Sequence, residues 1–284
     1  MIAGKAYAKV NLGLRVGARR EDGFHPVDGI FQSVDIADSL WLAPGEADSI
    51  ASSSGGPVPD ELDNLAFRAI AAVRGVVQST QPFQLTLDKE IPTAAGLGGG
   101  SADAAAALAL AGRYFGTATA TLHELAPQLG SDVPFCLTGG SARVSGRGDV
   151  IEPCDHLAGF ALAVVVPPLE ISTPAAFRQW DKMGGPSGLQ IAQGELPPDL
   201  RGEGDLINDL YPAATALAPA LDDWRADIEL GWGRSVMLSG SGPSLYSFFL
   251  DRDEATDALA AVPVGNRFAD ACDLVGVGWE FTDL

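Results

Sequence analysis

The stretch FQLTLDKEIPTAAGLGGGSADAA, residues 83–105, predicts a strand, a glycine-rich loop and a helix in direct succession. Apolar and polar side chains alternate over 83–91, which is typical of a strand. Glycine fills four of the five positions 96–100, and glycine allows positive φ and a close approach of backbone to a ligand. The Ala-rich run that follows predicts a helix from Ser101, a good N-cap residue, to about Arg113.

A loop of this kind is typical of an anion site. Its amides and the helix N-terminus would converge on one point, which favours a phosphate group. The loop is not a Walker A motif, because no Gly-Lys-Ser/Thr follows, and it is not a dinucleotide fingerprint, because Ser101 stands where G-x-G-x-x-G from Gly96 requires glycine. The glycine run alone would equally suit a flexible turn before a capped helix, and the strand–loop–helix context favours phosphate.

The rest of the chain predicts two α+β units. Strands are expected at 5–16, at 29–43 as one or two strands, at 160–166, on both sides of a glycine turn at 236–250, and at about 272–281. Helices are expected at 64–78, at 119–129 ending in Gly130, within 206–230 and at 253–262, with loops at 44–60 and 183–205. A soft boundary near residue 160 divides the chain into domains 1–159 and 160–284.

Charge and composition exclude several classes of function. The 284 residues include 18 Lys and Arg but 37 Asp and Glu, a formal net charge of −19. Such an acidic chain is a poor partner for nucleic acid or anionic membranes, although a few basic side chains and backbone amides can still form a local anion pocket. Three cysteines without C-x-x-C spacing and three scattered histidines predict neither a disulfide framework nor a zinc site.

The apolar runs are short. Neither 102–111 nor 160–166 approaches the roughly 18 residues needed to span a bilayer, and the first ten residues lack the apolar core of a signal peptide. We therefore expect a soluble, cytoplasmic protein.

Two further places carry polar residues of interest. Asp132 lies in the turn GSDVPF, 130–135, whose backbone Pro134 restrains, and Tyr7, Lys9 and Asn11 share one strand face by the two-residue period. Taken alone, an aspartate in a turn is typical of a cap, and polar side chains on a strand face are typical of a solvated surface.

Taken together, these motifs change the interpretation. In this order along nearly the whole chain, the sequence resembles the GHMP small-molecule kinases in AKVNLGL (8–14), FHPVDGIFQSVD (24–35), DNL (63–65), LDKEIPTAAGLGGGSADAA (87–105), GSDVPF (130–135) and LSGSGPSLYSFF (238–249). The resemblance implies an α+β, two-domain kinase fold, with a ribosomal-S5-like N-terminal domain, a ferredoxin-like C-terminal domain and the site in the cleft. Within the family it is most similar to the branch that uses ATP to phosphorylate the tertiary 2-hydroxyl of a diphosphocytidyl methylerythritol in non-mevalonate isoprenoid synthesis.

The resemblance also implies roles for individual residues. Lys9 and Asp132 match the catalytic pair, with Asp132 as general base and Lys9 keeping it ionised. Asn64 and Lys89 match the adenosine end. The ATP phosphate loop corresponds to Pro92, Thr93, Ala94, Ala95, Gly96, Leu97, Gly98, Gly99, Gly100, Ser101 and Ala102. The cytidine and substrate positions are Phe24, His25, Phe31, Thr173 and Phe177, with Asn11 near the methylerythritol.

ATP and Mg²⁺ are the expected cofactors, with Mg²⁺ arriving on ATP. Which side chain would ligate the ion is left open, because Gly99 and Gly100 stand where homoserine and mevalonate kinases carry serine and Ala102 stands where a second serine is common. Those glycines favour the diphosphocytidyl branch. Phe24 replaces a frequent tyrosine, so stacking is kept and a phenolic hydrogen bond is lost.

Two other functions stay open at this stage. One is another GHMP kinase acting on homoserine, mevalonate or a sugar, against which the aromatic set at 24, 31 and 177 argues. The other is a nucleotide-binding protein without catalysis, against which Lys9 and Asp132 together argue. Two smaller questions concern direction: where the Asp103 carboxylate points, and whether Arg143 and Arg147 supply positive charge to a substrate diphosphate or are simply solvated.

Overall fold

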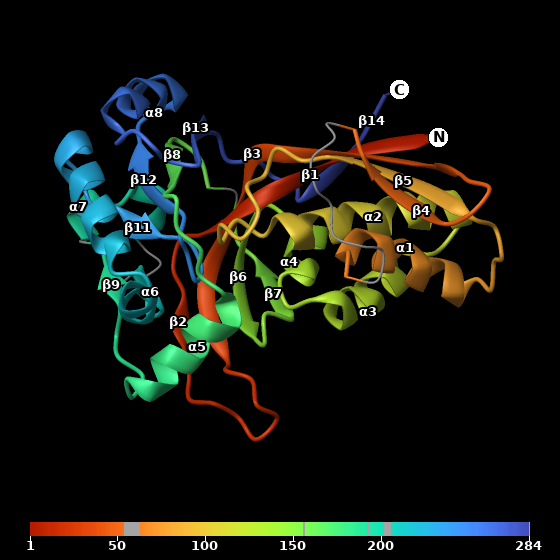
Figure 1. Ribbon diagram of the computed structural model, residues 1–284, viewed down its shortest axis with the longest axis horizontal. Helices are drawn as coiled ribbons and strands as arrows, with labels where there is room; N and C mark the ends of the chain where they lie inside the picture. The colour runs from red at the N-terminus through yellow and green to blue at the C-terminus, as the bar shows by residue number, and fades with distance from the viewer. Residues whose placement is uncertain (54–62, 156, 192, 202–205, 284) are drawn as a thin grey trace.

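The computed structural model describes residues 1–53, 63–155, 157–191, 193–201 and 206–283. Two β-sheets lie side by side, each covered by helices, and the N-terminus lies close to the final strand (Figure 1). Part of the predicted loop 44–60 and His156 lie outside the described residues.

The first sheet is organised by one long strand, β3 (Val27–Pro44). Its start pairs with β2 (Arg15–Val16) and β6 (Ser141–Gly146), its middle with β1 (Ile2–Asn11), and its end with β5 (Phe83–Asp88). The sheet is completed by β4 (Ser49–Ser52), β7 (Val150–Pro153) and β14 (Trp279–Thr282). All of these pairings are antiparallel except that of β4 with β5.

One face of this sheet is covered by α1 (Leu65–Val76), α2 (Gly99–Phe115), α3 (Thr119–Leu129) and α4 (Val133–Thr138) (Figure 1). Helix α2 is buried without interruption from Ala102 to Gly112. A helix that is apolar all round belongs in a protein interior, and small alanine side chains let neighbouring elements approach it closely. The Ala-rich run therefore makes α2 the central helix of this half of the molecule.

The second sheet has the strand order β11-β12-β8-β13 and is antiparallel throughout. Its strands are β8 (Ala161–Val166), β11 (Met237–Leu238), β12 (Leu245–Phe249) and β13 (Phe268–Cys272), and its helices are α5 (Thr173–Lys182), α6 (Tyr211–Leu217), α7 (Ala220–Trp232) and α8 (Arg252–Ala258). Along the chain, these elements follow as strand, helices, two strands, helix and strand. Combined with the spatial order of the sheet, this is the ferredoxin-like arrangement that the family resemblance implies.

Short elements complete the chain. A two-stranded pair joins β9 (Leu189–Gln190) to β10 (Ile207–Asn208), and single 3₁₀ turns lie at Gln193–Glu195, Pro198–Leu200 and Leu259–Ala261.

The two sheets share apolar packing through β8. Ala161, Ala163 and Val165 face the helices of the second sheet, whereas Leu162, Val164 and Val166 join the core cluster of the first sheet. A strand buried on both faces reads as a continuous apolar run, and the prediction of a buried strand at 160–166 is confirmed.

Local patterns predicted most elements but missed some boundaries. The expected helices at 64–78 and 119–129 are confirmed, whereas the expected strand 5–16 is divided into β1 and β2, and 206–230 begins with the short strand β10. Residues 49–52 of the expected loop pair with β5, because the exposed polar stretch lies beside an open sheet edge. The division at residue 160 stays a prediction, although β14 returns from the C-terminal half to pair with β1.

Candidate active site

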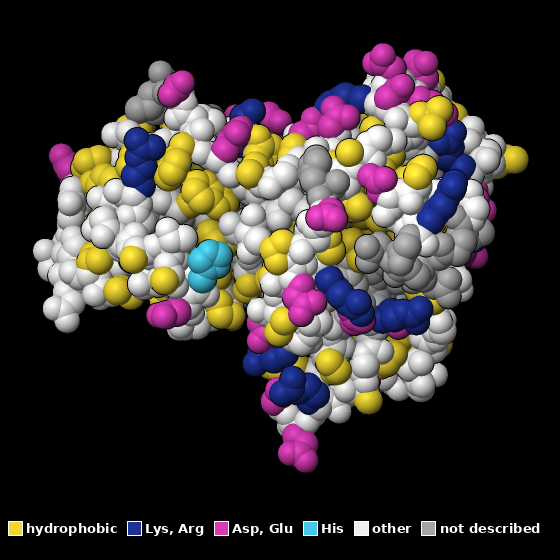
Figure 2. Space-filling model, turned by 180° about the vertical axis from the view of Figure 1, so that it is seen from behind, with side chains coloured by type: hydrophobic (Ala, Val, Ile, Leu, Met, Phe, Trp, Pro, Cys, Tyr) yellow, Lys and Arg dark blue, Asp and Glu magenta, His cyan; other side chains and the backbone are white. Residues whose placement is uncertain are grey.

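One cavity of about 860 Å³ is lined by residues of the first sheet, the glycine loop, α5 and the 239–244 turn. It brings together most of the predicted site residues: Lys9, Asn11, Phe24, His25, Phe31, Asn64, Lys89, Pro92, Thr93, Ala94, Ala95, Gly96, Gly98, Gly99, Gly100, Ser101, Asp132, Thr173 and Phe177. Leu97 and Ala102, the other two predicted members of the phosphate loop, are buried and do not line the cavity, so their place at the site stays a prediction. Acidic and basic side chains are both scattered over the face shown in Figure 2.

Lys9 and Asp132 form an ion pair inside this cavity. Lys9 Nζ lies 3.3 Å from Asp132 Oδ2 and donates a hydrogen bond to Asn11 Oδ1 at 2.5 Å. The lysine is only 4% exposed, and its ammonium lies 5.3 Å from the ring centre of Phe31. The strand pattern alone is typical of a solvated surface lysine. Lys9 is instead buried, which is rare for a lysine without a charged partner.

The backbone around Asp132 leaves its carboxylate available to a ligand. Asp132 occupies the N-cap position of α4, yet its side chain makes no capping hydrogen bond, and Pro134 lies in the first turn as predicted. Its side chain is 34% exposed, in contrast to the enclosed lysine beside it. A carboxylate with one fixed cationic neighbour and an open side can take a proton from a bound hydroxyl group.

The glycine loop enters α2 without a side-chain cap. The helix begins at Gly99. The preceding residue, Gly98, is the N-cap and adopts the left-handed conformation with φ 72°. Ser101 is therefore not the N-cap as predicted: it lies in the first turn, where its amide donates to the Gly98 carbonyl. Because the first amides of a helix lack partners within the helix, an uncapped N-terminus facing a cavity suits an anion.

Three loop carbonyls are held by the second half of the chain. The Ala95 oxygen accepts from Ser244, and the Gly96 oxygen accepts from Ser239 Oγ at 3.1 Å. The Thr93 oxygen accepts from the Arg267 guanidinium at 2.6 Å. Hydrogen bonds to its carbonyl oxygens therefore hold the backbone of the glycine loop in place.

Sequence reasoning missed the serines that make these contacts. Their signal was the second Gly/Ser stretch at 239–244, which supported the family resemblance but received no role. Ser241 of the same stretch lines the cavity and shares a 2.8 Å hydrogen bond with Thr173 Oγ1.

Lys89 is held by two buried carboxylates. Its ammonium pairs with Asp38 and lies 2.6 Å from Asp103 Oδ2, so Asp103 points toward Lys89. Burial opposes the charge on Lys89, but the two carboxylates outweigh burial and raise its pKa. Asp38, which sequence reasoning missed, also accepts from the amides of Glu90 and Ile91 at 2.6 and 2.8 Å. It thereby positions the turn that leads into the glycine loop.

Asn64, at the other predicted adenosine position, is the N-cap of α1. Its Oδ1 accepts from the amides of Ala66 and Phe67 at 2.9 and 3.1 Å. That oxygen is therefore already engaged within the protein.

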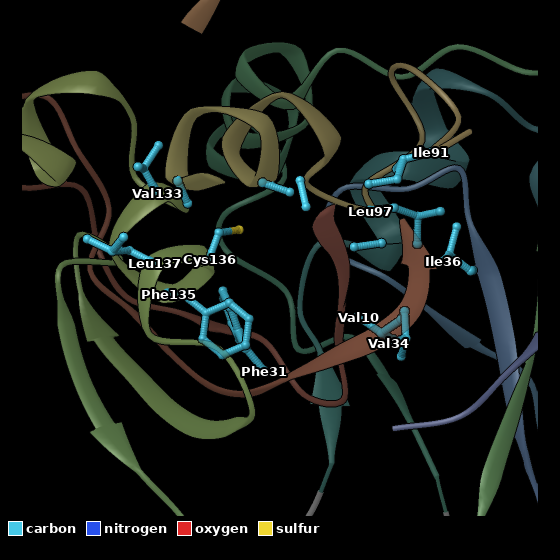
Figure 3. Packing of buried hydrophobic residues seen from close by; sticks show 14 of the residues in the cluster. Val10, Phe31, Val34, Ile36, Ile91, Leu97, Val133, Phe135, Cys136 and Leu137 are labelled. Carbon is cyan, nitrogen blue, oxygen red and sulfur yellow. The ribbon is translucent and has the colours of Figure 1, made fainter. Parts of the chain in front are cut away.

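The aromatic residues at the far end of the cavity are less uniform than predicted. Phe177 stacks on His25 with ring centres 5.2 Å apart, and the Arg147 guanidinium lies 3.6 Å from the centre of the Phe24 ring. Phe31 is 3% exposed and packs edge-on against Phe135 (Figure 3), so it supports Lys9 and offers no open face for stacking. Its predicted place among the stacking residues is corrected accordingly.

Arg143 and Arg147 have different surroundings. Arg143 makes a two-point ion pair with Asp28 on the surface, at 2.7 and 2.8 Å, and does not line the cavity, whereas Arg147 does.

Neither a metal-binding cluster nor a membrane-spanning helix is present among the described residues. They contain no group of three His, Cys, Asp or Glu residues that could hold a metal ion. No helix among them is long and apolar enough to cross a bilayer.

Comparison with known proteins gives a consistent answer. Residues 64–140 match the family model described as the GHMP kinases N terminal domain. A 4-diphosphocytidyl-2-C-methyl-D-erythritol kinase of Corynebacterium efficiens is 37% identical over an alignment of 281 positions, gaps included, which covers 92% of this chain and 89% of that protein. One from Streptomyces coelicolor is 34% identical, with 98% and 97% of the two chains covered.

Solved structures agree. The crystal structure of a 4-(cytidine 5'-diphospho)-2C-methyl-D-erythritol kinase superposes with a TM-score of 0.75 at 30% identity, over 96% of this chain and 99% of the other. Homoserine kinase from Cytophaga hutchinsonii, at 19% identity and a TM-score of 0.71 over 99% and 97% of the chains, shares the fold. The chain therefore belongs to the 4-diphosphocytidyl-2-C-methyl-D-erythritol kinase family of GHMP kinases.

Proposed function

We propose that the protein transfers the γ-phosphoryl group of ATP to the 2-hydroxyl of 4-diphosphocytidyl-2-C-methyl-D-erythritol. One observation carries the proposal: the enclosed Lys9–Asp132 pair and the uncapped N-terminus of α2 line the same cavity. Phosphoryl transfer depends on positioning and on charge stabilisation, and it needs no covalent intermediate with the protein. This arrangement supplies an anion site and a proton acceptor together.

The phosphates of ATP would lie over Gly98, Gly99 and Gly100. A side chain added at Gly100 would meet no protein atom nearer than 4.0 Å, so the space beside this residue is open to a ligand. The α2 amides and the helix dipole favour the negative phosphate oxygens there. The fixed loop carbonyls keep these donors in place before the nucleotide arrives, which reduces the reorganisation needed for transfer.

Asp132 would accept the proton of the substrate hydroxyl as that oxygen attacks the γ-phosphorus. Lys9 Nζ, 3.3 Å from Asp132 Oδ2, would stabilise charge on the phosphoryl group during transfer. Asn11, which accepts from the Lys9 ammonium, and Phe31 beneath it hold the lysine in one position. The ammonium is therefore oriented by contacts that do not depend on substrate.

Mg²⁺ is proposed as the counter-ion of ATP. The chain offers the Ser101 hydroxyl and the Asp132 carboxylate beside the phosphate site, and it offers no closed cage of acidic residues in the described part. This donor set fits a magnesium ion that keeps water and phosphate oxygens as most of its ligands. When bound, the ion would neutralise phosphate charge.

The cytidine end of the substrate would lie against His25, Phe177 and Phe24. These rings come from the 17–26 loop and from α5, and all three residues line the cavity. Arg147, stacked on Phe24, places a positive charge in the same region, which suits a diphosphate. The glycine loop lies at one end of the cavity and the aromatic residues lie at the other. The cavity is therefore long enough to hold ATP and a second ligand that carries a nucleotide.

The decisive experiment measures ADP release with ATP, Mg²⁺ and the diphosphocytidyl substrate beside methylerythritol phosphate, which lacks the cytidine. We expect ADP release with the first compound and a product heavier by one phosphate group. Comparable turnover of homoserine or mevalonate would indicate another GHMP kinase. ATP binding without ADP release on any acceptor would indicate a nucleotide-binding protein.

A further inference from the structure

His25 is held by three side chains of a single helix. Its Nε2 lies 2.8 Å from Asp181 Oδ1, Phe177 stacks on its face at an interplanar angle of 27°, and Trp180 meets it edge-on with ring centres 5.7 Å apart. The imidazole side chain is only 7% exposed, yet His25 lines the cavity. The ring is thus fixed in its plane as well as at one edge.

The spacing of these contacts follows from helix geometry. Phe177 and Asp181 are four residues apart on α5, so both project from one face of the helix. Trp180 is itself anchored, since it is buried and its Nε1 donates to the Pro186 carbonyl at 3.1 Å. Helix α5 therefore presents a rigid support to a residue from a distant loop.

The contact with Asp181 has a chemical consequence for the ring. An ionised carboxylate only accepts hydrogen bonds, so Nε2 must carry the proton in this pair. In the neutral imidazole, Nδ1 then keeps its lone pair, and no described residue makes a hydrogen bond to Nδ1. One ring nitrogen is thus left as an acceptor in a residue that lines the cavity.

Building on the proposed function, we propose that Asp181 is a positioning residue that fixes His25 as the Nε2–H tautomer and thereby selects a pyrimidine with an exocyclic amino group. An Nδ1 acceptor attracts the 4-amino group of cytosine. Uracil presents a carbonyl oxygen at the same place, and two acceptors facing each other in an enclosed site leave both unsatisfied. No local pattern indicates this role, because Asp181 lies 156 residues from His25.

The first test observes the tautomer directly in the ligand-free protein. Nitrogen-15 NMR of the imidazoles is recorded at about pH 8.5, above the ordinary histidine range. The His25 signals are assigned by their loss in His25→Gln. We expect the Nε2–H form in wild type and a shift toward Nδ1–H in Asp181→Ala. A predominant Nδ1–H form in wild type, or no change in the variant, would overturn the proposal.

The second test measures base discrimination. The ratio of kcat/KM for the diphosphocytidyl substrate to that for its diphosphouridyl analogue is compared in wild type, Asp181→Asn and Asp227→Asn. The amide of Asp181→Asn can face Nε2 with either its oxygen or its NH₂ group, so it no longer dictates the tautomer. Asp227 is an exposed residue of α7 and controls for the loss of one acidic charge.

We expect the ratio to fall about tenfold in Asp181→Asn alone, which corresponds to about one net hydrogen bond. The change should lie in KM for the diphosphocytidyl substrate, with kcat and the KM for ATP near those of wild type. An unchanged ratio in Asp181→Asn, or an equal fall in Asp227→Asn, overturns the proposal. If wild type phosphorylates neither compound, the proposed function fails, and the NMR result still decides whether Asp181 sets the tautomer.

Discussion

Two alanine substitutions in the glycine loop test the proposed role of Lys9 and the proposed phosphate site separately. A β-carbon added at Gly98 would lie 2.9 Å from Lys9 Cγ and 3.0 Å from Lys9 Cε, at a residue with φ 72°. A β-carbon at Gly100 meets only Leu65 Cδ1, at 4.0 Å. Gly98→Ala should therefore displace Lys9, whereas Gly100→Ala should leave it in place.

The expected magnitudes follow from these environments. Left-handed backbone costs a residue other than glycine about 1–2 kcal/mol, and at roughly 2–4 °C per kcal/mol for a chain of this size Gly98→Ala should lower Tm by about 2–8 °C. Since misplacing a catalytic group by about 1 Å can slow a reaction about a hundredfold, we expect kcat to fall by about ten- to a hundredfold. Gly100→Ala lies in α2, where alanine is favoured over glycine by about 0.5–1 kcal/mol, so Tm should not fall.

The assay is steady-state ADP release at saturating diphosphocytidyl substrate with ATP varied, beside thermal unfolding of each variant. Gly98→Ala should lower kcat, and Gly100→Ala should mainly raise KM for ATP, because its methyl group enters the open space beside the loop. The reasoning is refuted if Gly98→Ala keeps the kcat of wild type, or if Gly100→Ala loses as much kcat as Gly98→Ala.

Three further predictions concern charged residues. Asp132→Asn should lower kcat by about 10²–10⁴-fold while ATP binding, measured by titration, persists; near-normal kcat would remove Asp132 from the chemistry. Lys9→Met should also lower kcat, and Lys9→Arg should not restore it because a planar guanidinium does not fit an enclosed ammonium site; full activity of the arginine variant would contradict this. Burial raises the pKa of Asp103 to about 7, although the positive charge of Lys89 opposes this. The folded state therefore binds more protons than the unfolded state between about pH 4 and 7. The free energy of unfolding then falls as pH rises through that window. Asp103→Asn should remove this loss and gain Tm relative to wild type at pH 8 but not at pH 4, and parallel Tm curves would argue against the assignment.

Periodicity predicted the secondary structure well where one pattern dominated locally. The alternating run at 83–91 and the helical spacing from 64 correspond to β5 and α1. The apolar residues of β5 are buried, whereas α1 buries one side and leaves Val76 at its end exposed. The predicted ends of helices and strands were less accurate, as at the start of α2. There, Gly98 in the left-handed conformation displaced the expected Ser101 cap, because backbone conformation and not side-chain preference set the helix start.

The environment of a polar side chain could not be predicted from spacing. Lys9 and Asn11 follow an ordinary alternating strand pattern, and only the packing of the glycine loop and the 239–244 turn over β1 encloses them. Asp103 likewise reads as a helix N-terminal acid, and its partner Lys89 becomes evident only when β5 and α2 are packed together. Hydrogen bonds between distant segments leave no local signature.

Residue patterns alone were sufficient to predict the glycine loop, the Ala-rich helix, the buried strand β8 and, through motifs in matching order, the kinase family. These depend on backbone freedom and on burial, which residue types express locally. Three contacts are evident only in the folded structure: Phe31 beneath Lys9, Arg147 over Phe24, and Asp181 beside His25. Each of those contacts joins elements far apart in the chain, and their geometry is set by how the two sheets and their helices pack, which no window of sequence encodes.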